Sequence, residues 1–131
     1  NTGIRMSFTN FLETEILDHV FGGNAYTAPS NLYLGLYTAT PSDTGGGTEL
    51  SGSGYARLAM AMSVSGNLAT NSAAEEFATA TGSWGTVTHV GVFDAATSGN
   101  LMAYGTLSAS KAVATGDVFR IPAGDLDITL T

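Results

Sequence analysis

The fold class is decided by a short alternating stretch, Leu32-Tyr33-Leu34-Gly35-Leu36-Tyr37, in which leucine returns at every second position. Successive side chains of a β-strand point to opposite faces, so a period of two is typical of a strand with one face in a core. Residues 58–64 and 125–130 alternate in a similar way. Further strands are predicted over residues 74–79, 86–94, 100–107, 111–115 and 117–121.

Turn-forming residues separate these strands. Examples are Ser65-Gly66-Asn67, Ser98-Gly99-Asn100 and Thr115-Gly116-Asp117, and each combines residues that favour tight turns. Strands that recur about every 8–15 residues between such turns are typical of a sandwich or barrel. We therefore predict a mainly β fold, an antiparallel β-sandwich or jelly-roll-like domain, over residues 32–131.

The one helix that the sequence predicts precedes these strands, over residues 8–21. Its apolar side chains recur every four residues and would form one stripe: Phe8, Leu12, Ile16 and Val20. We expect Ser7 or Asn10 to cap its start and Gly22-Gly23 to end it. Residues 1–31 would thus be an N-terminal helix and linker, within a single globular unit. The linker allows the helix to pack on its own sheet or on a neighbouring subunit.

The composition describes one acidic domain. Of the 131 residues, 44% are hydrophobic and 11% are charged, which argues against a disordered chain. Four Lys and Arg against 11 Asp and Glu give a net charge of −7. Nucleic acids and anionic membranes require a basic face, so we predict neither as a partner. The sequence has no cysteine, which excludes disulfides and thiolate metal sites.

Candidate catalytic groups are few. His89 and Asp94 could form a triad with a serine, but positions 89 and 94 point to opposite faces of a regular strand. Asp43 and Glu49 flank a glycine-rich loop and are a weak candidate for binding Ca²⁺. The common nucleotide-binding, metalloprotease and serine-hydrolase motifs do not occur. We therefore predict a protein that is not an enzyme and that has no cofactor and no metal site.

Three residues are candidates for a subunit interface: Arg57, Arg120 and Trp84. In so acidic a chain, each arginine can pair with a carboxylate on the surface or bridge two subunits, and arginine is enriched at interfaces. The sequence leaves both interpretations open. Few lysines are available to protect the edges of the predicted sheets from pairing, so we also expect the chain to form a homo-oligomer.

Several segments carry a resemblance to known proteins: residues 11–13, residues 32–38, Gly54-Tyr55-Ala56-Arg57 and, most specifically, residues 84–95. Together they resemble a family of small virion proteins of tailed bacteriophages, variously described as tail-fibre-like, head-fibre or capsid decoration proteins. The resemblance extends over nearly the whole chain. It implies a structural component of the virion, made in the host cytoplasm, with no catalytic residues.

The expected place in the virion follows from the absence of a fibre-like sequence. A fibre usually has repeats, heptads or a long shaft, and none is visible here. We therefore expect a capsid decoration (cement) protein, most simply a homotrimer, that binds the major capsid protein on the outer surface of the head and stabilises it. The alternative is a tail-fibre or tail-associated protein. The third hypothesis is a glycan-binding module with an aromatic platform of Trp84, Tyr33, Tyr37 and Tyr104.

Overall fold

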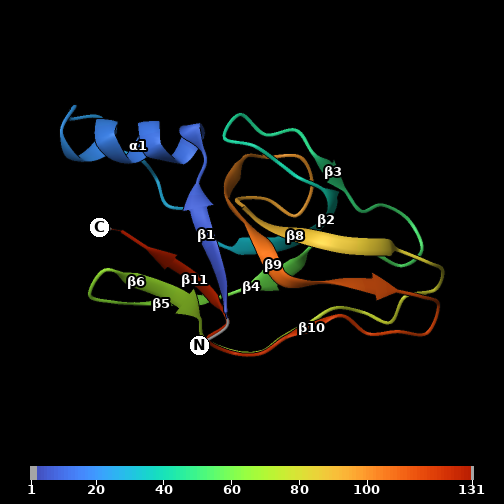
Figure 1. Cartoon of the computed structure of the whole chain (residues 1–131). Coiled ribbons are helices and arrows are strands. Elements are labelled where there is room, and N and C mark those ends of the chain that lie inside the picture. The colour runs from blue at the N-terminus through green and yellow to red at the C-terminus, as the bar shows by residue number, and fades with distance from the viewer. Residues whose placement is uncertain (1–2, 131) are drawn as a thin grey trace.

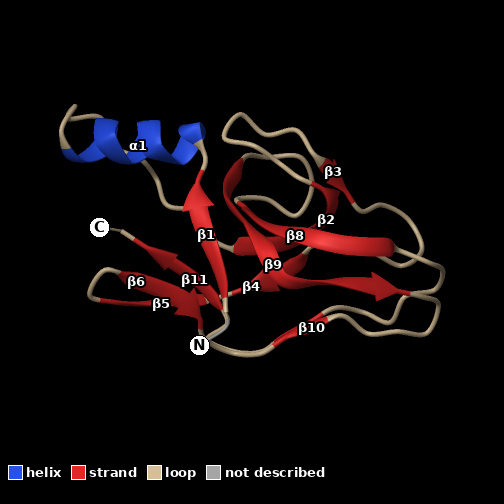
Figure 2. Cartoon of the chain, viewed as in Figure 1, coloured by secondary structure: helices blue, strands red, loops and turns tan. Residues whose placement is uncertain are grey.

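The computed structural model describes residues 3–130 and confirms a mainly β protein with one helix near the N-terminus (Figures 1 and 2). The helix, α1, spans Asn10–Val20. The strands are β1 (Ile4–Phe8), β2 (Leu32–Ala39), β3 (Thr48–Glu49), β4 (Leu58–Met60), β5 (Met62–Ser65), β6 (Leu68–Asn71), β7 (Glu75–Glu76), β8 (Gly85–Phe93), β9 (Leu101–Val113), β10 (Arg120–Ile121) and β11 (Leu126–Thr129).

Nine of these strands form one sheet. Their order is β3-β2-β8-β9-β1-β11-β6-β5, and β4 also pairs with β2. Every pair is antiparallel except β1 with β11, which run parallel. The sheet is therefore mixed, whereas the sequence analysis predicted an antiparallel one.

β1 lies inside this sheet, although the sequence analysis assigned no strand to the residues before the helix. Met6 is opposite Gly105 of β9 on one side and Ile128 of β11 on the other. A Cβ atom at Gly105 would collide with the backbone of Arg5, so the glycine allows β1 and β9 to approach closely. Ile4 and Met6 are buried and alternate with exposed residues. This period of two spans only five residues, which is why it is not conspicuous in the sequence.

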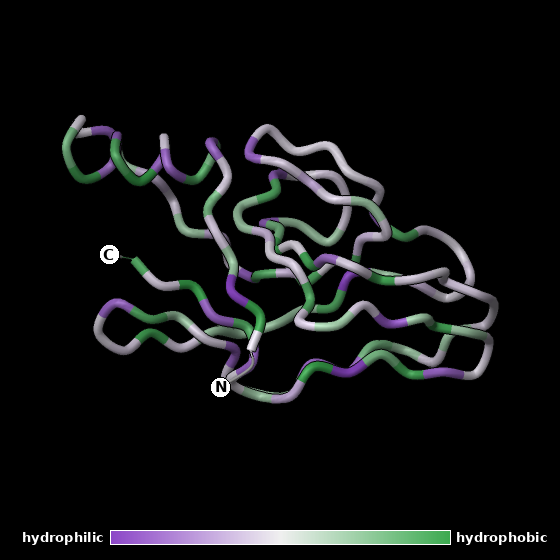
Figure 3. The backbone as a smooth tube through the Cα atoms, in the orientation of Figure 1, coloured by the Kyte–Doolittle hydropathy of each residue, from purple (hydrophilic) through white to green (hydrophobic). Residues whose placement is uncertain are grey.

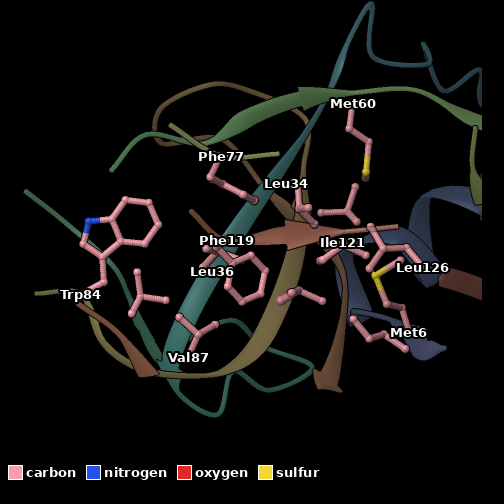
Figure 4. Packing of buried hydrophobic residues seen from close by; sticks show 14 of the residues in the cluster. Met6, Leu34, Leu36, Met60, Phe77, Trp84, Val87, Phe119, Ile121 and Leu126 are labelled. Atoms are coloured by element: carbon pink, nitrogen blue, oxygen red, sulfur yellow. The ribbon is translucent and has the colours of Figure 1, made fainter. Parts of the chain in front are cut away.

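The pair β7–β10 forms a second, small sheet that gives the domain a sandwich-like core. Phe77, Phe119 and Ile121, in or beside these two strands, join the same buried cluster as Leu34 and Leu36 of β2 (Figure 4). Apolar and polar residues alternate along the strands that enclose this cluster (Figure 3). The alternating stretch 32–37 thus supplies two side chains with no exposed surface, Leu34 and Leu36, at the centre of the core.

Several predicted strand bounds are wrong. Residues 58–64 are divided between β4 and β5, and residues 74–79 and 117–121 contain only the short strands β7 and β10. Residues 100–107 and 111–115 were predicted as two strands, but β9 is continuous. The reason is a shift in the β8–β9 register between Val87 and His89, which accommodates extra residues of β9 without ending the strand.

The start of α1 is capped by Thr9, where the sequence analysis expected Ser7 or Asn10. The Thr9 hydroxyl accepts a hydrogen bond from the Leu12 backbone N–H at 3.5 Å. It also donates to the Leu101 carbonyl oxygen in β9 at 2.7 Å. This one side chain therefore caps the helix and attaches it to the sheet.

The expected apolar stripe of α1 is only partly buried. Leu12 of this stripe is buried, but Val20 is 60% exposed. Leu17 and Phe21, outside the stripe, are 58% and 82% exposed. The helix ends before Gly22-Gly23, as predicted, with Phe21 as its C-cap. α1 projects from the sheet (Figure 1), and the exposed fractions of these apolar side chains show that they are left uncovered.

Candidate functional site

A polar cluster lies at the edge of the large sheet, where β3 and β4 both pair with β2 and leave a gap. β3 pairs with Tyr37 and Ala39, and β4 pairs with residues 32–34. The Tyr55 hydroxyl fills the gap: it accepts from the Leu36 backbone N–H at 3.0 Å and donates to Glu49 at 2.7 Å. Burial and the bond to Glu49 raise the pKa of Tyr55, so the hydroxyl keeps its proton and the donor role.

Arg57, a candidate interface residue, completes this cluster. Its guanidinium forms a two-point contact with the Glu49 carboxylate, in which Nε and Nη2 each donate at 2.8 Å. Nη1 donates to the carbonyl oxygens of Ala95 at 3.0 Å and Ser98 at 2.7 Å. The guanidinium carbon lies 3.5 Å from the centre of the Phe93 ring, and the bond to Glu49 raises the pKa of Arg57. Arg57 thus ties β3 to the loop that follows β8.

Trp84, the second candidate, lies in the core. Its side chain makes edge-on contacts with Tyr55 and Phe77, at ring-centre distances of 5.6 and 6.4 Å. The indole N–H donates to the Ser53 carbonyl oxygen at 2.8 Å. The residue is 5% exposed, so its ring is not presented on the surface of this chain.

Of the four residues of the hypothetical aromatic platform, Trp84 is separated from the three tyrosines. Trp84 is in the core, whereas the register of β2, β8 and β9 places Tyr33, Tyr37 and Tyr104 on the opposite face of the large sheet. Tyr37 stacks there on Phe93 with ring centres 6.3 Å apart, and the Tyr104 hydroxyl donates to Asp43 at 2.6 Å. A platform of all four rings is therefore not formed.

Arg120, the third candidate, is on the surface. It lies directly opposite Glu76 in the β7–β10 pair, and the two charged groups are 3.8 Å apart. Their side chains are 53% and 64% exposed. An exposed pair of this kind contributes about 0–1 kcal/mol to stability. Arg120 remains accessible to another molecule.

The residues considered for catalysis are separated. His89 lies beside the hydroxyls of Thr88 and Thr40, at 2.8 and 3.4 Å. Asp94 instead accepts hydrogen bonds from the backbone and side chain of Asn100, at 2.7 and 2.9 Å. No group of three or more His, Asp or Glu side chains that could hold a metal ion occurs within residues 3–130. In that same range, no helix has the length and hydrophobicity needed to cross a membrane.

Asp43 and Glu49, the weak candidates for Ca²⁺, have different partners. Glu49 binds Arg57 and Tyr55, as described, and Asp43 binds the Tyr104 hydroxyl. Asp43 also lines a hollow of about 410 Å³ between the start of α1 and the loops at 43–46 and 99–101. It supplies the only carboxylate among the described lining residues. The hollow can form hydrogen bonds with a polar molecule, but it lacks an acid–base pair.

A surface feature that the sequence analysis did not predict is an exposed apolar region, which we call the apolar end. It comprises Leu17, Val20, Phe21, Val64 and Leu130, each more than half exposed. The sequence places these residues in separate elements, and the expected helix stripe includes one of them, Val20. Only the fold shows that they remain uncovered.

The polar cluster around Arg57 therefore holds the domain together, and the apolar end is a separate, exposed surface. A comparison with protein families gives both features a context. The family model for the podophage GP4 fiber I protein gp80 matches residues 7–129. The chain belongs to this family. A search among curated proteins gives no match.

Membership in the podophage fibre family confirms the resemblance to small structural virion proteins. It associates the protein with the bacteriophage virion and with a structural role. Membership in this family is compatible with both candidate positions in the virion, the outer surface of the head and the tail.

Proposed function

We propose that this chain is a non-enzymatic structural subunit of a phage fibre-type appendage, and that it assembles there as a homo-oligomer, most simply a trimer. The observation that supports this proposal is the family match, which covers residues 7–129. The internal use of Arg57 and Glu49 agrees with it, because these charged groups stabilise the domain instead of facing a substrate. The domain would act as an attachment module, since the one helix and the packed sheets of residues 3–130 offer no shaft.

A capsid decoration protein is the second candidate. The absence of a shaft within residues 3–130 favours it, because a compact sandwich-like domain can sit on a shell lattice without further chains. Its partner would be the major capsid protein, and the area buried between neighbouring capsid subunits would stabilise the head.

The number of copies per particle tests both candidates. Purified virions and tailless heads would be compared by quantitative mass spectrometry. An appendage subunit should be present in few copies and be lost from tailless heads. Hundreds of copies that stay on tailless heads would overturn the fibre assignment and support decoration. Absence from purified virions would contradict both.

A further inference from the structure

The exposed apolar residues gather at one end of the molecule. Six large apolar side chains within residues 3–130 are exposed, and the apolar end contains five of them, at 55–82% exposure. The C-terminal part of α1, the β5–β6 hairpin and the end of β11 lie on the same side in Figures 1 and 3. The sixth residue, Val118, precedes β10 at another part of the surface. Such a concentration marks an interaction surface.

The helix part of the apolar end is held in place by its own linker. Phe11, on the inner side of α1, contacts Tyr26 with ring centres 6.5 Å apart. The Tyr26 backbone N–H donates to His19 at 3.0 Å, and the Asn24 side chain donates to Asp18 at 2.9 Å. The linker residues Asn24 and Tyr26 therefore cover the side of α1 that carries Phe11 and Asp18. Because the outer side is already ordered, little conformational entropy is lost when another molecule packs on it.

The sheet part of the apolar end is an open edge. β5 is the last strand of the large sheet and joins β6 through the two-residue turn Gly66-Asn67. Gly66, with a φ of 60°, occupies the first central position, where a type II′ turn requires glycine. The alternation from this turn directs the backbone N–H and C=O of Val64 toward the outer edge. Residues 61–74 contain no charged residue and no proline, which are the usual protections of an edge.

A hollow of about 250 Å³ lies between α1 and the end of β11. It is lined by Met6, Ser7 and Phe8 of β1, by Glu13 of α1, and by Ile128, Thr129 and Leu130. The Leu130 backbone N–H donates to the Asn67 carbonyl oxygen at 3.0 Å, which holds Leu130 beside the hairpin. Leu130 therefore lies beside both the hollow and the β5–β6 hairpin.

The charge distribution favours the β5 edge as the place where two copies of this chain meet. Two copies that each carry a net charge of −7 repel one another. They can approach most easily where charges are sparse, and residues 61–74 are entirely uncharged. We propose that the apolar end is the contact between copies: Leu17, Val20 and Phe21 of one copy pack on Val64 and Leu130 of the next. This inference rests on the homo-oligomer of the proposed function and names its surface.

The two halves of this contact differ, so a contact repeated from copy to copy is heterologous and can close into a ring, whereas a reciprocal contact, helix on edge twice, gives a two-fold dimer. In a closed ring, the exposed side of the helix and the edge strand of every copy are both covered, which agrees with the trimer proposed above. A contact between two β5 edges would instead give a dimer and leave the helix uncovered.

Three matched lysine variants test the surface by sedimentation velocity at micromolar concentration. Phe21→Lys places a cation at a helix C-terminus, where it suits the helix dipole, and Val64→Lys protects an edge strand, so neither should impair folding. Each should weaken association at least tenfold and leave the circular dichroism spectrum unchanged. Val118→Lys, away from the apolar end, should associate like the natural chain. A monomeric natural chain at 100 μM, or equal loss in all three variants, would overturn the proposal.

Mixing two variants tests the helix-on-edge contact. The natural helix of the Val64→Lys chain can pack on the natural edge of the Phe21→Lys chain, so a mixture should form a 1:1 heterodimer at a concentration at which each variant alone is monomeric. A mixture that stays monomeric would overturn the helix-on-edge contact.

Incorporation into virions separates this inference from the proposed function. If the natural chain is found in purified virions but is monomeric in solution, the contact surface is wrong and the structural role stands. If the chain is absent from virions, the proposed function fails and the proposal, which rests on it, fails too.

Discussion

Replacing Arg57 by lysine should destabilise the domain by about 3 kcal/mol although the positive charge is kept. The arginine makes four hydrogen bonds, two to the Glu49 carboxylate and two to the carbonyl oxygens of Ala95 and Ser98. It also covers the Phe93 ring. A lysine ammonium is a compact group on a flexible stem and cannot form all four of these bonds at once.

The magnitude follows from the contacts that lysine loses. Lysine can keep one bond to Glu49 and one to a carbonyl oxygen. Two of the four bonds that the Arg57 guanidinium donates are then broken or weakened, and each contributes about 1–2 kcal/mol. The lost contact with Phe93 adds about 0.5–1 kcal/mol. The side chains of Arg57 and Glu49 are only 10% and 23% exposed, so water replaces the lost bonds incompletely. These ranges add to about 2.5–5 kcal/mol. Partial replacement of the bonds by water puts the expected loss near the lower end, at about 3 kcal/mol, which is a large part of the roughly 5–15 kcal/mol that stabilises a typical domain.

Urea unfolding followed by fluorescence provides the assay. Trp84 is the only tryptophan and lies in the core, so its emission reports on global unfolding. The control is Arg120→Lys, which alters an exposed pair and should change the free energy of unfolding by less than about 0.5 kcal/mol. A loss below about 1 kcal/mol for Arg57→Lys, at an unchanged denaturant slope, would refute the account of the cluster.

Three further predictions concern titratable groups and their partners. Tyr55→Phe removes the acceptor of the buried Leu36 N–H and should cost about 1–3 kcal/mol in urea unfolding, whereas Tyr33→Phe should cost little; equal costs would contradict this. Burial raises the pKa of Tyr37 to about 12, above its unfolded value of 10. The stability that the buried, neutral Tyr37 hydroxyl contributes is therefore complete below pH 10 and is lost as the pH rises toward 12. Absorbance at about 295 nm with circular dichroism should show ionisation and unfolding together; ionisation of all tyrosines near pH 10 in a folded chain would contradict it. Burial also raises the pKa of Glu75, which means that the charged carboxylate is disfavoured in the folded chain. Glu75→Gln should therefore raise the melting temperature at pH 7, and this gain should vanish below about pH 4, where the carboxyl group is neutral. A gain that persists at low pH would argue against ionisation as the cause.

Strands with long regular alternation could be predicted from the sequence. β2 and β8 were expected within two residues of their observed bounds, because their period of two is conspicuous and their side chains fill the core. β1 was missed because its alternation is short and its place in the sheet depends on β9 and β11, which lie about 100 residues later. Such non-local pairing leaves no mark in a local pattern.

The roles of individual side chains were harder to predict. Arg57 was expected to pair with a carboxylate or to bridge subunits, and its partner Glu49 lies only eight positions away. Its bonds to Ala95 and Ser98, however, require the loop after β8 to fold against β3. The apolar stripe of α1 could not reveal that Val20 stays exposed, because periodicity identifies an amphipathic helix but not the surface that covers it.

The most direct test of the central claim is a reconstruction of the purified virion by cryo-electron microscopy. The account predicts that copies of this domain surround a symmetry axis on the exterior of the particle, with the α1 end of each copy against the β5 edge of its neighbour. Particles with no density that fits the nine-stranded sheet would contradict the structural role. Isolated copies that touch only other virion proteins would contradict the contact between copies.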